Sequence, residues 1–490
     1  MLDRRRLLTL GGITAGGVVG GALVLPPALK AKTSPDVAAQ TGHQPHYTPI
    51  AGTRHARPGT DFSQRMPIPR ELTPARRRDG VDVYRIPIQE VQHEFRPGVA
   101  SAIRTYGGRF IGPTIRARTG RPVEVTFTNQ LAVPSNVHLH GGHVPAASDG
   151  HPMTTIAPGG HLTYRYPNSQ QGATLWYHDH SHQSEVENVY KGLHGFYILD
   201  DEAERGLRLP GGQYDVPIML RDIELDAGGG LVFPNTQPTG NVILVNGVET
   251  PFFPVAARKY RFRLLNGAVD RTFRLTAGGV RLTQIGSDGG LLPAPVTRSE
   301  IVLSPGERAD VVVDFSRRPV GSSVVLYDVS GPVLRFDVVR TAPDPSRVPA
   351  TLRPLPPLGA ATVERDVSMK FDISGPVGVG LVNGRPYDPN RVDFRIRRGT
   401  TEIWRITNDD VDIALPHSFH MHLEQFQVLD RNGGPPNADD AGRKDTVFLA
   451  PGESIRIQTT FTEFAGRYAY HCHLLYHSGV GMMAQMEIVP

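Results

Sequence analysis

Histidine is the residue type whose placement in this 490-residue chain most directly suggests chemistry. The chain holds 19 histidines, and none lies between His194 and His417. Histidines scattered over a surface or a core would not leave so long a gap. Neutral imidazole is the commonest metal ligand in proteins. We therefore expect the two ends of the gap to cooperate in metal binding, and the part of the chain between them to act as a spacer.

Eight of these histidines form four His-x-His pairs. On a β-strand, residues i and i+2 project from the same face, so each pair presents two imidazoles to one point. A single pair is weak evidence, because it often marks only a polar strand face. Four pairs in matching places of a repeated fold would supply eight nitrogen ligands, which is more than one metal needs and about right for three. The pairs are His138 and His140, His178 and His180, His420 and His422, and His471 and His473.

The single cysteine, Cys472, lies between the last two of these histidines. If its neighbours point to one side of a strand, Cys472 points to the other and faces a different metal. His417 and His477 are the expected nitrogen partners, with Met482 as a weak axial ligand. Two histidines, one cysteine and a long axial methionine describe a blue-copper electron-transfer site. The backbone beside Cys472 would connect this site to the multi-metal cluster.

The chain repeats one β unit three times. Each copy has a Pro-Gly turn, an alternating strand and a second strand that ends in a short aromatic cluster; the turns begin at Pro158, Pro305 and Pro451. Further alternating segments precede them, within residues 114–129, 260–266 and 394–408. Such alternation marks strands with one buried face. With 53 Gly and 43 Pro, the chain is expected to be all-β, with three Greek-key β-sandwich domains.

The predicted domain boundaries lie near residues 205 and 350, the second within a Pro-rich linker from Thr341 to Pro357. Residues 81–205 and 351–490 would hold the metal ligands, and residues 206–350 none. Residues 32–80, which are polar and Pro-rich, are expected to form an extended arm. In the first copy Asp179 occupies the position of Cys472. A carboxylate cannot form a copper–thiolate bond, so only the last domain should carry a blue-copper site.

Residues 1–31 are expected to be an export signal rather than part of the fold. Arginines at positions 4–6 precede two leucines and a Gly- and Ala-rich apolar stretch, which resembles a twin-arginine signal. The alternative is an uncleaved membrane anchor, because the stretch is almost long enough to span a bilayer. Its many glycines argue against a stable span. The mature protein is therefore expected to be periplasmic, cell-wall-associated or secreted, without a membrane span.

The charge and the cysteine count exclude two further classes. The formal net charge is +4, of which +3 lies in residues 1–31, so the rest of the chain is nearly neutral and carries no electrostatic footprint for nucleic acid. One cysteine allows no intramolecular disulfide. A lone cysteine in an exported protein needs another purpose, and metal ligation supplies one.

At these histidines and Cys472 the chain resembles the multicopper oxidase family, most closely the bacterial group of spore-coat laccases, bilirubin oxidases and phenoxazinone synthases. The resemblance covers nearly all of residues 80–490. It implies cupredoxin-like domains and four copper ions per chain: one type 1, one type 2 and a type 3 pair. The ligands that it implies are His138 and His420 for type 2; His140, His178, His180, His422, His471 and His473 for type 3; and His417, Cys472, His477 and Met482 for type 1.

Two positions bear on proton supply. Asp149 matches an acid that lies near the type 2 copper in this group, and four-electron reduction of O2 consumes four protons. The alternative is an ordinary turn aspartate before Gly150. Several relatives carry glutamate directly after the histidine that corresponds to His477, where this chain has Ser478. Another acid or a water chain must therefore replace that route.

The resemblance implies a laccase-like oxidoreductase that takes single electrons from phenols, aminophenols or tetrapyrrole pigments and reduces O2 to water, with His477 at the substrate edge. Its partners would be a small aromatic reductant and O2. A cuprous or other metal-ion oxidase is the second possibility, although such enzymes often carry a Met-rich insertion and the nine methionines here do not cluster. A structural or copper-storing protein is the third, but structural relatives have lost ligands and this chain has lost none. A copper nitrite reductase would not need eight cluster histidines.

The remaining candidates are expected to have no ligand role. His182 is the best placed of them to contact a ligand. The others are assigned to the surface, the core or the arm: His143, His151, His161, His194, Met483, Met486, Trp176, His43, His46 and His55.

Overall fold

The computed structural model describes residues 61–234, 239–375 and 377–490. The predicted export signal and residues 32–60 of the predicted arm, with His43, His46 and His55, lie outside this range. The described residues belong to one compact unit, which runs from Arg54 to Pro490. None of the described helices has the length and apolar character needed to cross a bilayer.

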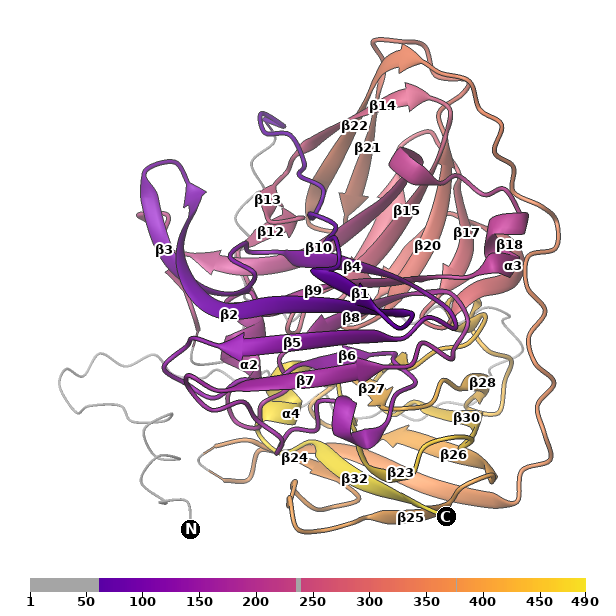
Figure 1. The fold of residues 1–490 in the computed structure, drawn as a ribbon. Helices are drawn as coiled ribbons and strands as arrows, with labels where there is room; N and C mark the ends of the chain where they lie inside the picture. The colour runs from indigo at the N-terminus through magenta and orange to yellow at the C-terminus, as the bar shows by residue number, and fades with distance from the viewer. Residues whose placement is uncertain (1–60, 235–238, 376) are drawn as a thin grey trace, which may run out of the picture. The chain divides into compact units, whose positions relative to one another are not determined.

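The first repeat consists of two β-sheets packed face to face (Figure 1). In β5 every second side chain is buried, as the alternating sequence predicts. One sheet has the order β1-β2-β5-β7 with β3 on β2, and the other the order β4-β9-β8-β6. The strands are β1 (Arg76–Arg78), β2 (Val81–Arg96), β3 (Val99–Tyr106), β4 (Gly112–Arg118), β5 (Val123–Asn129), β6 (His138–His140), β7 (His161–Tyr166), β8 (Ala173–His178) and β9 (His194–Asp200).

The middle repeat has the same two-sheet construction around its own apolar core. The sheet orders are β13-β12-β10-β15-β20-β17-β18, with β11 on β10, and β14-β22-β21-β16-β19. The strands are β10 (Asp215–Leu225), β11 (Leu231–Val232), β12 (Val242–Val245), β13 (Val248–Glu249), β14 (Phe252–Ala257), β15 (Lys259–Asn266), β16 (Phe273–Ala277), β17 (Leu282–Ser287), β18 (Gly290–Arg298), β19 (Ile301–Leu303), β20 (Arg308–Asp314), β21 (Ser323–Asp328) and β22 (Gly331–Thr341).

The third repeat is a sandwich of two five-stranded sheets, with the orders β24-β23-β26-β30-β28 and β25-β32-β31-β27-β29. Its strands are β23 (Val363–Asp372), β24 (Val379–Val382), β25 (Phe394–Arg397), β26 (Thr401–Asn408), β27 (His417–Met421), β28 (Gln427–Arg431), β29 (Thr446–Leu449), β30 (Ser454–Thr460), β31 (Gly466–Cys472) and β32 (Met483–Val489). Short helices lie between strands of the three repeats: η1 (Ala146–Ser148), α2 (Glu185–Tyr190), α3 (Glu202–Gly206), η2 (Gly212–Tyr214), η3 (Ala438–Asp440) and α4 (Leu475–Gly479).

The three repeats share one strand-pairing pattern. A parallel pair joins β2 to β5, β10 to β15 and β23 to β26. A second parallel pair joins β4 to β9, β14 to β22 and β25 to β32. The remaining named pairings are antiparallel, as Greek-key sandwiches require. The predicted all-β class with three sandwiches is confirmed, while the exact boundaries at 205 and 350 stay predictions.

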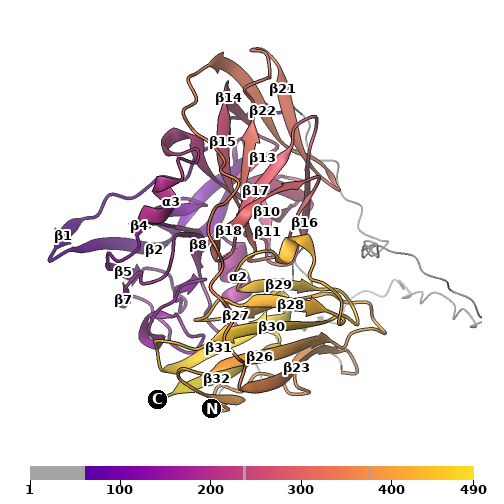
Figure 2. The same cartoon turned by 90° about the vertical axis from the view of Figure 1, so that its right-hand side faces the viewer.

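The connections between the repeats differ in kind. Residues 342–362, which include the predicted Pro-rich linker, contain no helix or strand and lead from β22 to β23 (Figures 1 and 2). A separate apolar cluster joins the first and middle repeats, and includes Trp176, Phe196, Met219 and Leu244. Before β1, the chain makes isolated bridges and buries Met66 in the middle core.

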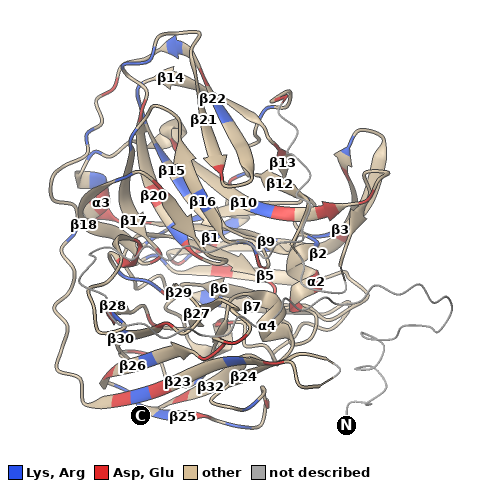
Figure 3. Ribbon diagram, turned by 180° about the vertical axis from the view of Figure 1, so that it is seen from behind, with Lys and Arg blue, Asp and Glu red and all other residues tan. Residues whose placement is uncertain are grey.

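Basic and acidic side chains are interspersed over the strands (Figure 3).

Candidate metal centre

Four strands, two from each outer repeat, carry the eight paired histidines. In the first repeat, β6 pairs with β8 so that His138 lies opposite His178. In the third, β27 pairs with β31 so that His420 lies opposite His471. The second member of three pairs lies just beyond its strand, at the point where the two repeats meet. All eight side chains are at most 1% exposed, so the site is fully enclosed by protein.

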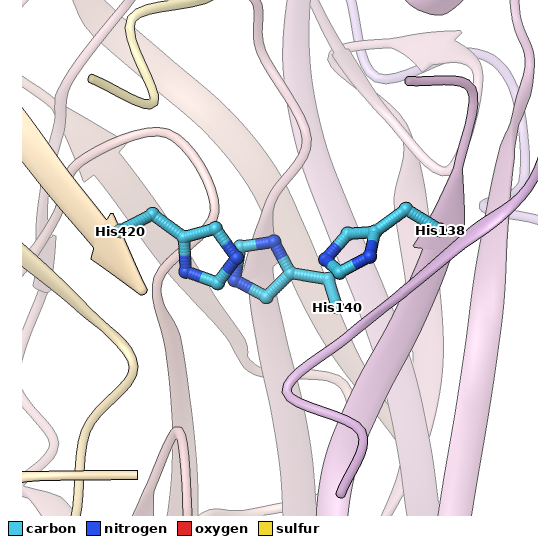
Figure 4. Close-up of side chains that lie close together, drawn as sticks. All are labelled: His138, His140 and His420. Carbon is cyan, nitrogen blue, oxygen red and sulfur yellow. The ribbon is translucent and has the colours of Figure 1, made fainter. Parts of the chain in front are cut away.

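The eight imidazoles fall into three groups in which potential ligand atoms lie within 4.8 Å of one another, and two of the groups share His140. Figure 4 shows one group, in which His420 of β27 faces His138 and His140 of β6. His140 also belongs to a second group. The three groups are His138, His140 and His420; His140, His178 and His473; and His180, His422 and His471.

The hydrogen bonds of the rings test whether metal ions fit here. Backbone carbonyls hold the Nδ1 atoms of His138 and His420, at 2.6 and 2.7 Å, and the Nε2 atom of each has no protein partner. His140 is turned the other way, with Nε2 on Asp445 at 2.9 Å and Nδ1 free. A buried imidazole nitrogen without a partner is costly. One bound and one free nitrogen per ring is the arrangement of metal-ligating histidines.

Burial also sets the protonation of the eight rings. It lowers the pKa of every one of them, with neighbouring histidines adding to the effect in most cases. The pKa of His180 falls to about 3 and that of His471 to about 4. The rings are therefore neutral at physiological pH, which is the form that binds metal ions. The donor set fits copper, for which imidazole is a suitable ligand.

Cys472 points away from this cluster, as the alternation of β31 predicts. Its Sγ lies 3.8 Å from Nδ1 of His417 and 3.5 Å from Nδ1 of His477, and these two nitrogens are 3.1 Å apart. The three residues form a fourth metal-competent group. Met482 is fully buried in the same core, and its carbonyl accepts the backbone N–H of Cys472 at 3.0 Å.

The group of His417, Cys472 and His477 is held by further contacts that the sequence did not predict. Asp410 Oδ2 lies 2.9 Å from Nε2 of His417, which leaves Nδ1 of that ring facing the sulfur. The same oxygen accepts the backbone N–H of Phe371 at 2.7 Å. Burial raises the pKa of the Cys472 thiol to about 12, so a metal ion that binds here must displace the proton.

Asp149 lies between the two outer repeats, completely buried. Its Oδ2 contacts Nδ1 of His422 at 2.8 Å, and its backbone carbonyl is the partner of His138. Oδ1 has no hydrogen-bond partner among the described residues. Burial raises the pKa of this carboxyl well above its usual range. Asp149 is also a turn residue, because it follows η1 and precedes Gly150 at φ +76°, so both interpretations of its position describe real features.

The middle repeat does more than separate the outer two, and the expectation of a mere spacer was wrong. Arg308 of β20 donates to both carboxylate oxygens of Asp445, at 2.7 and 2.6 Å, and Asp445 holds His140. Gly306 lies against the cluster: a Cβ there would come within 3.0 Å of the rings of His140 and His473. The middle repeat thus supplies no imidazole, but it packs against the histidine cluster and orients His140 through Asp445.

Asp179 lies in the first repeat at the position that Cys472 occupies in the third. Its buried carboxylate accepts hydrogen bonds from Ser135 Oγ at 2.6 Å, Asn136 N at 3.0 Å and Ser181 N at 2.9 Å. It belongs to none of the metal-competent groups found in the described ranges. Its contacts with Ser135, Asn136 and Ser181 tie the end of β8 to the preceding loop.

Among the described residues, the histidines without a predicted ligand role lie outside all of the metal-competent groups. His182 lies beside Tyr387, with ring centroids 4.9 Å apart, and His151 contacts Gln485. His194 is buried against Arg221, while His161 is exposed in β7. Trp176 is buried as expected, but it also stacks on His178 with a centroid distance of 4.3 Å.

Comparison with known proteins decides the family. The "Multicopper oxidase" family models match residues 87–204, 223–326 and 355–490. The chain belongs to the multicopper oxidase family. This membership establishes an oxidoreductase that uses O2, a cupredoxin-like fold and four copper ions of types 1, 2 and 3.

Individual relatives resemble most of the chain. A laccase of Bacillus stratosphericus is 34% identical, over 87% of this chain and 99% of its own length. A bilirubin oxidase of Albifimbria verrucaria is 35% identical, over 93% of this chain and 86% of its own. The crystal structure of a laccase from Pediococcus acidilactici superposes with a TM-score of 0.82 at 32% identity, over 87% of this chain and 94% of that one.

Proposed function

We propose that the protein is a laccase-like oxidase of small aromatic donors, such as phenols, aminophenols or pigments. The observation that carries the proposal is an apolar rim beside His477. The ring centroid of Phe371 lies 5.1 Å from that of His477, and Gly380 packs against the backbone carbonyl of His477. In the loop between Phe371 and Gly380, the side chains of Ile373 and Val377 are 60% and 52% exposed. An apolar rim beside a ligand edge suits a flat organic donor.

The same surface offers little to a cuprous ion. Soft thioether ligands would be needed to bind Cu(I). Among the methionines of the described residues only Met153 is exposed, and it lies in the first repeat between η1 and β7, not in the loop beside His477. The laccase and bilirubin oxidase names of the relatives point in the same direction. Oxidation of a metal ion remains the alternative outcome of the experiment below.

We assign the ligands as the family resemblance implies. Type 1 copper would be held by His417, Cys472, His477 and Met482; type 2 by His138 and His420; and the type 3 pair by His140, His178, His473, His180, His422 and His471. Bound copper supplies one-electron transfer at the first site and reduction of O2 at the other two. The supporting observation is that the three histidine groups and the Cys472 group contain all of these residues except Met482.

The chain's own groups complete the proposed chemistry. His477 is 2% exposed and lies behind Phe371, so it is the metal ligand that a donor on the rim approaches. Cys472 is bonded through the backbone to His471 and His473, which gives the electron a covalent route inward. Asp149 orients His422 through Oδ2 and forms a further metal-competent group with His138 and His422. We propose that its carboxyl, the only acid in such a histidine group among the described residues, also supplies a proton there.

We further propose export by the twin-arginine route, on the basis of the arginines at positions 4–6 and the apolar stretch that follows. This route carries folded proteins. It would therefore allow copper ligands from distant repeats to assemble before translocation.

The deciding experiment measures O2 uptake by copper-loaded protein with a methoxyphenol and with a Cu(I) complex as donors. We expect the phenol to give the higher kcat/KM, one O2 consumed per four electrons and no peroxide. Ile373→Lys should raise KM for the phenol several-fold. The matched control is Ile68→Lys. Ile68 is 50% exposed, like Ile373 an apolar surface residue, but it precedes β1 and is not part of the loop beside His477. A higher kcat/KM for Cu(I) would establish the metal-ion oxidase instead.

A further inference from the structure

Two short helices from different repeats meet beside the cluster. Helix α2 of the first repeat packs against α4 of the third, the helix that carries His477. The approach is close, because a Cβ at Gly479 would lie 2.6 Å from Cγ2 of Val186. Glu185 is the first residue of α2, and only 2% of it is exposed. A carboxyl group this deeply buried must be compensated by specific partners.

The partners of Glu185 come from both sides of this junction. Its Oε1 lies 2.9 Å from Nδ1 of His180, in the first repeat. Its Oε2 lies 3.3 Å from Oγ of Ser478, which can donate to it or to the carbonyl of Leu475 at 3.0 Å. In the described part of the chain neither Glu185 Oε1 nor His180 Nδ1 makes an aligned hydrogen bond, so the 2.9 Å approach of these two atoms is a close polar contact. The carboxyl therefore spans the space between His180 and the residue that follows His477.

We propose that Glu185 is a positioning residue, which fixes the ring of His180 and fastens it to helix α4 through Ser478. The inference rests on the proposed role of His180 as a copper ligand. With Nδ1 held toward Glu185, the Nε2 atom of His180 faces Nε2 of His422 at 3.2 Å. A carboxylate behind a ligating imidazole sets the tautomer and ring orientation, and strengthens the ligand.

The other rings of the cluster support this role. Asp149 holds His422 and Asp445 holds His140, each through a carboxylate oxygen within 3 Å of the ring nitrogen that faces away from the cluster. Glu185 and His180 make a third carboxylate–imidazole pair, with a close polar contact in place of an aligned hydrogen bond. It differs in that its second oxygen reaches the helix of His477, so it also joins the two predicted copper sites across the repeat boundary.

The test compares copper retention in three variants of the loaded full-length protein. Glu185→Leu removes both polar contacts. Glu185→Gln keeps one oxygen that can face His180 Nδ1, and an NH2 group that can donate to Ser478 Oγ. Glu187→Leu is the matched control, because Glu187 lies on the same helix but pairs outward with Lys191 and Arg104. Copper per chain is measured after dialysis against a graded chelator, together with the visible band of type 1 copper and the near-ultraviolet absorption of the type 3 pair.

We expect Glu185→Leu to weaken copper binding at the His180 group about 10- to 100-fold, which is the usual effect of losing such an outer partner. Near-ultraviolet absorption should fall while the visible band persists. Glu185→Gln should lose less copper than Glu185→Leu, and Glu187→Leu should retain as much copper as wild type. Unchanged retention in Glu185→Leu would overturn the inference, and so would equal loss in the Leu and Gln variants or loss of the visible band alone.

An exchange of the two side chains keeps the test decisive if Glu185→Leu folds poorly. Glu185→Ser alone should lose retention, and the double variant Glu185→Ser with Ser478→Glu should recover it, because Ser478 lies within 3.3 Å of the space that the carboxyl fills. A double variant no better than the single one would count against the role. Failure of the proposed donor specificity would be recognised separately: wild-type protein would then hold its full copper but would not oxidise phenols.

Discussion

Arg308 and Asp445 form a two-pronged ion pair that joins the middle repeat to the third directly behind a cluster histidine. Both guanidinium nitrogens are within 2.7 Å of a carboxylate oxygen, and neither side chain is more than 1% exposed. One of those oxygens is also the partner of His140. The orientation of His140 in the proposed copper site therefore depends on Arg308, more than 160 positions away in the sequence. Arg308 lies in the middle repeat, which contains no histidine.

Arg308→Met should destabilise the protein and disturb the cluster together. It leaves the Asp445 charge buried without its main partner, and breaking one side of a buried pair costs about 3–5 kcal/mol. Chemical denaturation of metal-free protein measures this loss. Arg308→Lys keeps the positive charge but not the two-pronged guanidinium contact, so its loss of unfolding free energy should be smaller. Wild-type stability in Arg308→Met would show that Asp445 is compensated by other groups.

Asp149→Asn should preserve the blue colour and slow turnover by about 10²-fold, in the range expected when a general acid is lost. The amide oxygen can still face Nδ1 of His422, so ligand geometry should survive, while the ionisable proton is gone. The visible spectrum and steady-state O2 uptake report the two effects separately. Normal turnover in this variant would remove Asp149 from the proton route and leave it as a turn residue.

His143 should make the contact between the outer repeats dependent on pH. Burial lowers the pKa of His143, but the hydrogen bond and charge of Glu424, the carbonyl of Leu423 and the charge of Glu463 together outweigh burial, so the net shift is upward. A group whose folded-state pKa is raised adds stability below its unfolded pKa and loses it as the pH rises through the folded value. His143→Gln should therefore unfold at a lower temperature than wild type near pH 5.5, and the difference should shrink near pH 9. A pH-independent difference would exclude the charged pair as its cause.

Changing the three arginines at positions 4–6 to lysine should block export if residues 1–31 are a twin-arginine signal. Because the route reads the arginine pair and not positive charge alone, a conservative change is sufficient. Fractionation followed by immunodetection would find the variant in the cytoplasm and wild type outside it. Equal distribution of both would favour the alternative of a simple apolar anchor.

The pairing of the cluster histidines, and the separate facing of Cys472, could be predicted from sequence because this geometry is local. The spacing of two in His138–His140, and Cys472 between two histidines, follow from strand alternation alone. Glu185, Arg308 and Asp445 escaped notice because each acts across a boundary between repeats, where sequence separation says nothing about distance. One signal did exist: Ser478, where several relatives carry glutamate, indicated that another acid or a water chain must replace that side chain, and the structure has Glu185 against it.

The division of the cluster between the first and third repeats has a consequence for the order of assembly. His180 and His422 face each other although 242 positions separate them, and His477 lies near the end of the chain. A nascent chain that has completed two sandwiches has only four of the eight cluster histidines, and none of the three histidine groups is complete. Copper can therefore be held at full strength only after β31 has been synthesised and has paired, so metal capture reports completion of the third sandwich.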